Sequence, residues 1–367
     1  MVDQPGAIPL SRVVVDASIR QAVDRVLASG TFINGPEVVA FEKEFAEFCG
    51  SDLGVATSNG TTAIILALQA LGVGPGDEVL CPSHSFIATA TPVSLLGATP
   101  VFVDIDDETM TIDPSAAAAL VTDKTVGIIA VHLYGQPADL DPLQELAEER
   151  GLFVLEDACQ AHGATYKGRT VGSLADIACF SFYPSKNLTV GGDGGMIVSD
   201  RDELIDAARA LRNHGRAPGD KYRHTRLGSN SRLSEIQAAI GRAGLSHLPK
   251  WSKQRQAIAA RYSKALAGHA QVRPPTAAAY AGHVYHMYVV RSSRRESLQS
   301  HLMQRKIATG IHYPIPIHQQ PIYVDTPPRA PLPRTEATAR QVLSLPMFPE
   351  LSDSDVATVC EGLSTFS

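Results

Sequence analysis

The sequence has little charge and no long apolar run, and both shortages restrict what the protein can be. Charged residues make up 19% of its 367 residues and hydrophobic residues 44%, which favours a large buried core over disorder. The net charge of −6 provides no basic field for nucleic acid or anionic lipid. No apolar run approaches the roughly 18 to 20 residues of a membrane span, and the N-terminus shows no signal peptide. We therefore expect a cytoplasmic protein without a nucleic-acid or membrane partner.

Cysteine is scarce, which argues against a disulfide framework and a zinc site. The residues concerned are Cys49, Cys81, Cys159, Cys179 and Cys360, scattered and never in CxxC spacing. The histidines of the segment His312-Tyr-Pro-Ile-Pro-Ile-His318 also lack the number and spacing of a metal centre. We expect no bound metal.

Short apolar runs alternate with helical patterns between about residues 54 and 200. Continuous rather than alternating apolar runs are typical of strands buried on both faces of a parallel sheet. Strands that alternate with helices indicate βαβ units and an α/β fold. The predicted strands are residues 79–81, 100–103, 126–131, 152–155, 177–180 and 196–198.

The pattern changes near residue 245. One long helix is predicted over residues 248–266, followed by a mixed, proline-rich segment and a closing helix over 352–363 with Ser352 as its cap. A crossover helix is predicted over 139–150, with Asp139 as its cap. We expect a large domain over residues 1–245 and a smaller C-terminal α+β domain over 246–367, with the N-terminal ~20 residues packed on the small domain.

An acidic pair and a loop lysine are the first candidate site residues. Glu156 and Asp157 follow the apolar run at 152–155, where ligands bind in open α/β sheets, although a helix N-cap gives the same pattern. Lys186 lies in an apolar stretch between Ser181 and a glycine run at 191–195. A loop lysine is usually a solvated cation, but a desolvated one can act as nucleophile and base.

A polar turn at residues 57–63 opens an amphipathic helical pattern. Its free backbone N–H groups are typical of a phosphate site, although an ordinary N-cap has the same sequence. Together with the carboxylate and the lysine, it completes the groups that pyridoxal phosphate needs. The lysine forms a Schiff base, the acid holds the pyridinium nitrogen charged, and the helix start binds the phosphate.

The chain resembles the DegT/DnrJ/EryC1/StrS family of sugar aminotransferases, a branch of the fold type I pyridoxal phosphate enzymes. The resemblance extends over nearly the whole chain. It rests on motifs at residues 30–36, 58–62, 131–137, 156–163, 180–186, 228–237, 312–314 and 343–346. It implies a mainly parallel seven-stranded sheet between helices as the cofactor domain.

The resemblance also implies individual roles. Lys186 would form the Schiff base and transfer the substrate proton, and Asp157 would pair with the pyridine nitrogen. Other cofactor contacts would come from Gly60, Thr61 and Ser181 on the phosphate, Gln160 on the phenolic oxygen, and Phe86 stacked on the ring. Asn230 would reach the phosphate of the other subunit, which implies a homodimer with shared active sites. Tyr183, His312, Tyr313 and His318 would contact the sugar. Taken alone, Phe86 is more typical of core packing, and residues 230–235 of a capped helix start.

The implied reaction is amino transfer from L-glutamate to a 3- or 4-keto-6-deoxyhexose nucleotide, with the 3-ketone preferred. The alternatives are a cyclitol or aminobenzoate precursor as substrate, a sugar dehydratase, which Lys186 disfavours, and a regulatory protein that only binds the cofactor. Residues 212–226 carry five cations, namely Arg212, Arg216, Lys221, Arg223 and Arg226. Such a segment suits an anionic substrate such as a nucleotide diphosphate, or is simply a solvated loop.

Overall fold

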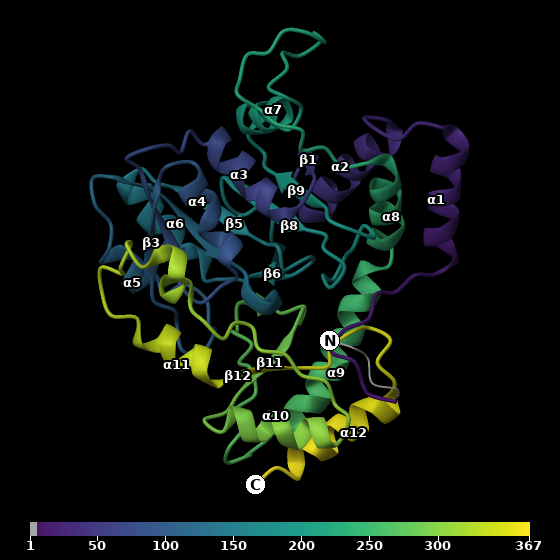
Figure 1. The fold of residues 1–367 in the computed structure, drawn as a ribbon, viewed down its shortest axis with the longest axis vertical. Helices are drawn as coiled ribbons and strands as arrows, with labels where there is room; N and C mark the ends of the chain where they lie inside the picture. The colour runs from purple at the N-terminus through teal and green to yellow at the C-terminus, as the bar shows by residue number, and fades with distance from the viewer. Residues whose placement is uncertain (1–5) are drawn as a thin grey trace.

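A seven-stranded sheet forms the centre of the larger part of the molecule (Figure 1). The computed structural model describes residues 6–367, so residues 1–5 of the predicted large domain lie outside it. Neighbouring strands are parallel except at β9, which is antiparallel to both β8 and β1. The predicted fold class is therefore confirmed. In spatial order the strands are β1 (Gly54–Thr57), β9 (Gly195–Val198), β8 (Ile177–Ser181), β5 (Phe153–Asp157), β4 (Thr125–Val131), β2 (Glu78–Pro82) and β3 (Thr99–Val103).

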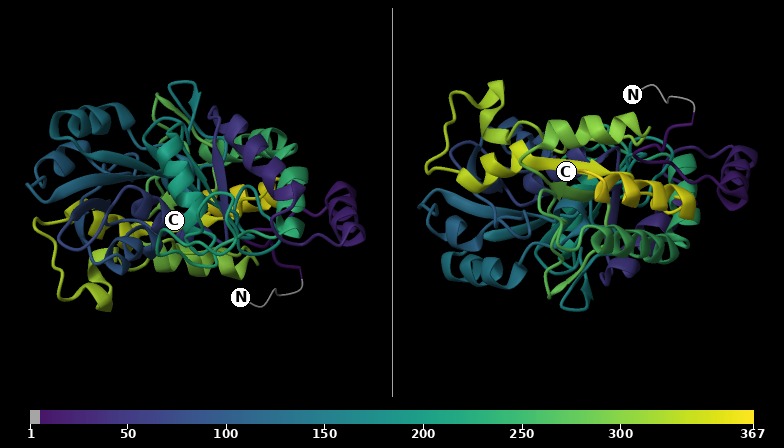
Figure 2. Two further views of the ribbon diagram at one scale, coloured as in Figure 1. Left: turned by 90° about the horizontal axis from the view of Figure 1, so that it is seen from above. Right: turned by 90° about the horizontal axis from the view of Figure 1, so that it is seen from below.

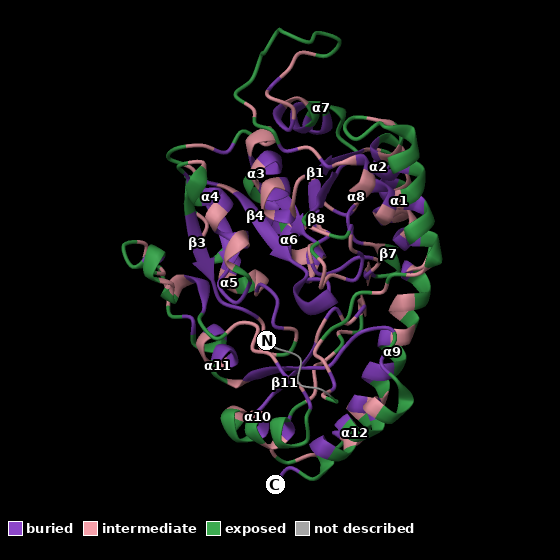
Figure 3. Cartoon of the chain, turned by 45° about the vertical axis from the view of Figure 1, so that its right-hand side comes forward, coloured by how far each residue is buried: buried purple, intermediate pink, exposed green. Residues whose placement is uncertain are grey.

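Helices cover both faces of this sheet, which is why its strands are apolar along their length. One face packs against α2 (Pro36–Cys49), α6 (Leu140–Arg150) and α8 (Glu235–Leu245). The other packs against α3 (Gly60–Ala70), α4 (Thr91–Leu95) and α7 (Asp202–Leu211). The buried strands and the exposed outer sides of the helices are visible in Figure 3.

Two local expectations differ from the structure. The apolar runs do not predict β1, because this four-residue strand contains glycine and alanine, which have weak strand preference. Asp139 precedes α6 as expected, but its carboxylate accepts a hydrogen bond from the Tyr166 hydroxyl at 2.6 Å and caps no helix N–H.

A second hydrophobic core lies below the sheet in Figure 1. It joins the antiparallel pair β11 (Tyr288–Arg291) and β12 (Val342–Leu345) to α9 (Leu248–Ala265), α10 (Arg295–Gln304) and α12 (Asp353–Ser364). The predicted helices over 248–266 and 352–363 are confirmed, and the Ser352 hydroxyl caps α12. Ile8 of the N-terminal segment is buried in this core, and its N–H donates to Lys306 O at 2.8 Å. A domain boundary between α8 and α9 stays a prediction.

The remaining elements lie at the periphery. They are α1 (Ala17–Ser29), α5 (Pro114–Ala118), α11 (Pro333–Gln341) and a small sheet of β6 (Thr165–Tyr166), β7 (Arg169–Thr170) and β10 (Ala281–Gly282). Helix α1 projects from one edge of the molecule (Figure 2) and packs on α8. Residues 213–231 extend beyond α7 as a long excursion (Figure 1). Within residues 6–367, no helix is both long and apolar enough to cross a bilayer.

Candidate active site

Three segments meet at the carboxyl ends of β5 and β8. Asp157 is the last residue of β5, Ser181 is the last residue of β8, and Gly60 begins α3 directly after β1. The contact is tight, because a Cβ on Gly60 would lie 2.6 Å from Ser181 Cβ and 3.1 Å from Cys159 Sγ. Only glycine fits this position without movement of the neighbouring strand end.

The start of α3 offers unpaired backbone donors beside Ser181. Asn59 caps the helix by accepting from Thr62 N–H at 2.8 Å. The N–H groups of Gly60 and Thr61 donate to no other atom of residues 6–367. Free N–H groups at a helix start, together with nearby hydroxyl groups, form a site that suits a phosphate.

The carboxylate of Asp157 is buried, with 6% of the residue exposed. It accepts hydrogen bonds from Thr89 Oγ1 at 2.9 Å and from Cys159 N–H at 3.3 Å, both neutral donors. Among residues 6–367, no lysine, arginine or histidine lies within ion-pair distance of it. A buried carboxylate without a cation is costly, so this position fits a ligand that brings a positive N–H group, as a pyridinium ring does.

Glu156, the other member of the acidic pair, has a structural role. Its carboxylate accepts from the backbone N–H groups of Gly172 at 3.0 Å and Leu174 at 2.9 Å, and it contacts His132 Nε2 at 3.0 Å. The alternation of a strand directs the two neighbouring carboxylates to opposite faces of the sheet. Only Asp157 is thus available to a ligand.

Lys186 lies in the loop between β8 and β9. Its backbone N–H donates to Tyr183 O at 2.8 Å, and its Nζ donates to no atom of the described chain. Burial lowers the pKa of the Lys186 amine, while the nearby Cys159 and Asp157 oppose this change. A free amine with a lowered pKa can act as nucleophile and base.

Gln160 and Phe86 lie beside these groups. The Gln160 side chain accepts from Tyr134 N–H at 2.8 Å and donates to Tyr313 OH at 3.1 Å. Phe86 is 51% exposed, and its ring centre lies 5.6 Å from that of Tyr313. An exposed aromatic ring is not core packing, and here it is available to stack on a planar ligand.

Sequence reasoning missed a set of residues that support the site. Tyr134 OH accepts from His84 Nε2 at 2.8 Å and donates to His312 O, so it ties the end of β4 to the His312 segment. Burial lowers the pKa of His84 to about 3, which keeps this imidazole neutral. Thr89, which holds Asp157, was also missed. The motif at 131–137 marks Tyr134, but no local pattern marks Thr89.

The residues predicted to contact the sugar differ in how exposed they are. Tyr183 is 53% exposed, and His312 bonds through Nδ1 to Ser344 Oγ at 2.8 Å. His318 instead bonds through Nδ1 to Ser83 Oγ at 2.7 Å and lies 3.7 Å from Glu336, with its side chain only 6% exposed. This leaves His318 little surface for a substrate.

The five cations of residues 212–226 lie in two different environments. Arg212 is buried, where it pairs with Glu42 and donates to Ala56 O at 2.6 Å, so it is not available to a substrate. The other cations of the segment lie in the excursion. Asn230 is at the base of the excursion, is exposed, and makes no side-chain hydrogen bond within the described residues.

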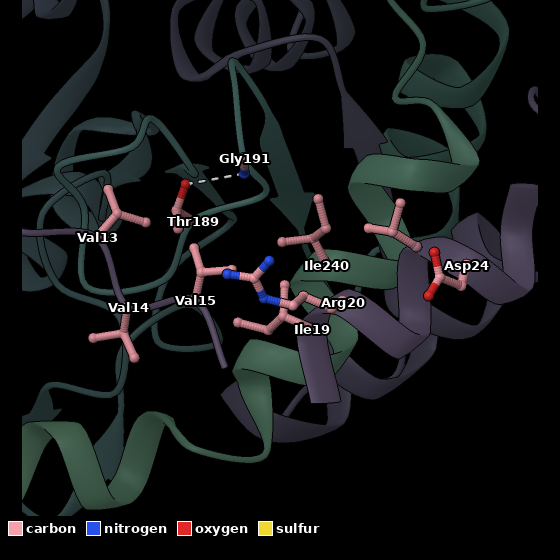
Figure 4. A pocket seen from close by; sticks show the side chains of 10 residues that line it. Val13, Val14, Val15, Ile19, Arg20, Asp24, Thr189, Gly191 and Ile240 are labelled. Atoms are coloured by element: carbon pink, nitrogen blue, oxygen red, sulfur yellow. Dashed lines mark hydrogen bonds between the residues drawn. The ribbon is translucent and has the colours of Figure 1, made fainter. Parts of the chain in front are cut away.

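Two cavities lie near this region. The larger, of about 390 Å³, is mostly apolar and lies between the N-terminal segment at Val13 and Ile240 of α8 (Figure 4). None of the predicted site residues lines it. The smaller, of about 190 Å³, is lined by His312 and by Ser185 next to Lys186. Residues 6–367 contain no group of three or more potential metal ligands, and all five cysteines are unpaired.

Comparisons with known proteins show the family and the fold of the chain. The DegT/DnrJ/EryC1/StrS aminotransferase family matches residues 14–364. A dTDP-3-amino-3,4,6-trideoxy-alpha-D-glucose transaminase of Streptomyces venezuelae is 47% identical, over 93% of this chain and 90% of that protein.

Two solved structures are similar over almost the whole chain. Streptomyces venezuelae DesV in complex with a ketimine intermediate has a TM-score of 0.92 at 46% identity, covering 95% of this chain and 94% of that one. NtdA of Bacillus subtilis with bound cofactor PMP has a TM-score of 0.90 at 31% identity, covering 99% and 85%.

Proposed function

The chain belongs to the DegT/DnrJ/EryC1/StrS aminotransferase family, and we propose that it transfers an amino group from L-glutamate to the ketone of a keto-deoxysugar nucleotide. The observation that carries this proposal is the buried Asp157, which has no cation of its own and lies beside the unpaired amine of Lys186. Pyridoxal phosphate needs both groups: a lysine amine to form a Schiff base, and a carboxylate to hold the ring nitrogen charged.

Different residues would hold different groups of the cofactor. Gly60, Thr61 and Ser181 would bind its phosphate, Asp157 its ring nitrogen and Gln160 its phenolic oxygen. Phe86 would cover one face of the ring. When bound, the cofactor supplies an electron sink for the charge left on a carbon that loses its proton. The amine of Lys186 would take that proton and return it, and burial lowers the pKa of this amine, which favours its neutral, basic form.

Carbon 3 is the proposed position of amination. The Streptomyces venezuelae relative is named for a 3-amino sugar carried on dTDP, and it covers 93% of this chain. Tyr183, His312 and Tyr313 are the proposed sugar contacts, while His318 is a weaker candidate because of its burial. Lys186 argues against the dehydratase alternative, and the free amine argues against a protein that only binds the cofactor.

The test is to supply purified protein with pyridoxal phosphate. A visible absorbance band should develop and should bleach with L-glutamate, and borohydride reduction should leave the cofactor covalently on Lys186. Lys186→Ala should lose the band and turnover, whereas Lys253→Ala on α9 should keep both. If no band forms in the wild-type protein, the proposal fails. A panel of 3-keto and 4-keto sugar nucleotides, read by 2-oxoglutarate release, then identifies the acceptor.

A further inference from the structure

Tyr134 has a backbone conformation that is costly for its residue type. Its φ is 59° and its ψ is 5°, in the left-handed region where an L side chain crowds the backbone. The residue lies just beyond the end of β4 and is 3% exposed, and the proposed function gives it no role. Non-glycine residues persist in this conformation where the surrounding contacts hold them, and they are concentrated at functional sites.

The hydroxyl of Tyr134 fixes the peptide that leads into Tyr313. It donates to His312 O, the carbonyl oxygen of that peptide. Because a carbonyl can only accept, the hydroxyl hydrogen is committed to this bond, and the Tyr134 oxygen accepts from His84 Nε2 at 2.8 Å. His84 is only 1% exposed, so these bonds lie in the interior, where hydrogen bonds are electrostatically stronger than in water.

The backbone of Tyr134 fixes Gln160, which holds the other end of Tyr313. The Tyr134 N–H donates to Gln160 Oε1 at 2.8 Å, and this contact sets the orientation of the amide. Gln160 Nε2 then donates to Tyr313 OH at 3.1 Å. The contacts form a closed ring, in which Tyr134 holds the peptide before Tyr313 through its side chain and the Tyr313 hydroxyl through Gln160.

The Tyr313 hydroxyl keeps one hydrogen that the described chain does not use. The hydroxyl accepts from Gln160 and donates to no atom of residues 6–367. Burial raises the pKa of Tyr313, so the hydroxyl stays protonated. The residue is only partly buried, and its ring centre lies 5.6 Å from that of Phe86. A free O–H group beside Gln160 and Phe86, both proposed cofactor contacts, suits an oxygen atom of a substrate.

We propose that Tyr134 is a positioning residue for Tyr313, and that it holds Tyr313 where the free hydroxyl hydrogen is donated to an oxygen of the sugar substrate. The inference rests on the proposed function, in which Tyr313 contacts the sugar. It separates the two substrates of the reaction. L-Glutamate depends on the cofactor contacts, whereas the sugar depends on Tyr313 as well.

The test compares two amino compounds on Tyr134→Phe, which removes the hydroxyl and keeps the N–H that holds Gln160. L-Glutamate and dTDP-3-amino-3,4,6-trideoxy-α-D-glucose, for which the Streptomyces venezuelae relative is named, should each bleach the band of the cofactor-loaded protein. The amino form of the acceptor that the panel identifies replaces this sugar if the two differ. Stopped-flow absorbance gives a second-order rate constant for each compound. With the sugar it should fall by about tenfold, the size expected for one lost hydrogen bond, and with L-glutamate it should stay within about twofold.

A double variant tests whether Tyr134 acts through Tyr313. Tyr313→Phe should lose at least as much with the sugar as Tyr134→Phe. The double variant Tyr134→Phe/Tyr313→Phe should be no worse than Tyr313→Phe alone, because residues of one network are not additive. Tyr166→Phe is the matched control. Tyr166 is 5% exposed, and its hydroxyl bonds to Asp139 at 2.6 Å outside the site, so both rate constants should stay unchanged.

Three results would overturn the inference. They are an unchanged rate constant with the sugar in Tyr134→Phe, an equal loss with both compounds, and additive losses in the double variant. A comparable loss in Tyr166→Phe would also overturn it, since any buried tyrosine hydroxyl would then have the same effect. A wild-type protein that forms no band, or whose band is bleached by no amino-sugar nucleotide, would instead refute the proposed function.

Discussion

Asp157 ends strand β5, whereas Lys186 lies in the loop that follows the neighbouring strand β8. The carboxylate is held by two neutral donors, the Thr89 hydroxyl and the Cys159 N–H. The amine is unpaired, and burial lowers its pKa. At the scale of the residue, the site thus combines a buried negative charge that needs a ligand cation with a base that is free to react.

The charge of Asp157 can be tested separately from its shape. Asp157→Asn keeps the volume but can no longer hold a ring nitrogen in its charged form. We expect kcat to fall by about 100-fold or more while the cofactor still binds, a magnitude typical of a lost electrostatic contact. The measurement is steady-state turnover with L-glutamate. Asp139→Asn, whose carboxylate bonds to Tyr166 outside the site, is the control, and equal rates in the two variants would refute the role of Asp157.

At the scale of the element, the N-terminal ends of helices α3 and α2 make contacts that position neighbouring segments. The first turn of α3 has free N–H groups, and its first residue, Gly60, lies against Ser181. The start of α2 is held by Glu235 of α8, whose carboxylate accepts from Gly35 N–H and Glu37 N–H, both at 2.8 Å. A carboxylate at a helix N-terminus satisfies free donors and complements the helix dipole.

The close approach of α3 to β8 leads to a prediction for Gly60→Ala. The new methyl group would lie 2.6 Å from Ser181 Cβ, so the phosphate site must widen. We expect the affinity for pyridoxal phosphate to fall by about tenfold or more, measured by absorbance titration, because loss of even one good contact costs that much. Gly74→Ala, which has open space around its Cβ, is the control. An affinity equal to that of the control would contradict the prediction.

The α2–α8 contact leads to a stability prediction. Glu235 is buried, and Glu235→Gln replaces a charged acceptor by a neutral amide that also brings an unpaired NH₂ group. We expect the free energy of unfolding to fall by about 2 kcal/mol, within the range for a charged hydrogen bond. Thermal denaturation measures the change. Glu361→Gln, exposed on α12, should have almost no effect, and a matching loss there would argue against a specific cap.

At the scale of the whole molecule, the excursion of residues 213–231 contains a long exposed stretch. Leu227 is 90% exposed and Tyr222 81% exposed, although both are large hydrophobic residues. The stretch at 218–227 is exposed throughout, and Figure 3 shows it in green at the far end of the excursion. Exposed apolar side chains on a long excursion are typical of a surface that a partner covers. The proposed partner is a second copy of this chain, whose site would receive Asn230.

Mixed dimers test this sharing of sites. Lys186→Ala and Asn230→Ala should each be inactive or nearly so as homodimers. After the two variants are unfolded and refolded together, about half of the dimers combine both chains, and each of these has one intact site. About a quarter of the wild-type activity should therefore return, as two-fold symmetry requires. No recovery, with dimers confirmed by light scattering, would show that Asn230 does not act across the interface.

Local patterns in the sequence determined much of this molecule. The apolar runs predicted six of the seven central strands, since strands buried on both faces need continuous apolar residues. The cap residue Ser352 and the helix that follows it were likewise predictable, because capping and periodicity act over a few residues. Residue type, spacing and family motifs also predicted Lys186 and Asp157 as site residues, and their roles stay predictions.

Tertiary structure alone decided the contacts that join distant segments. Thr89 holds Asp157 across 68 positions of the chain, and Tyr134 ties His84 to His312. Arg212 and His318 suited a substrate by residue type, but the fold pairs them with Glu42 and Ser83. The physical reason is that a side chain's type shows what it can bind. Its burial and partners depend on which strands and helices pack together, and that choice is made by the whole core rather than by the neighbouring residues.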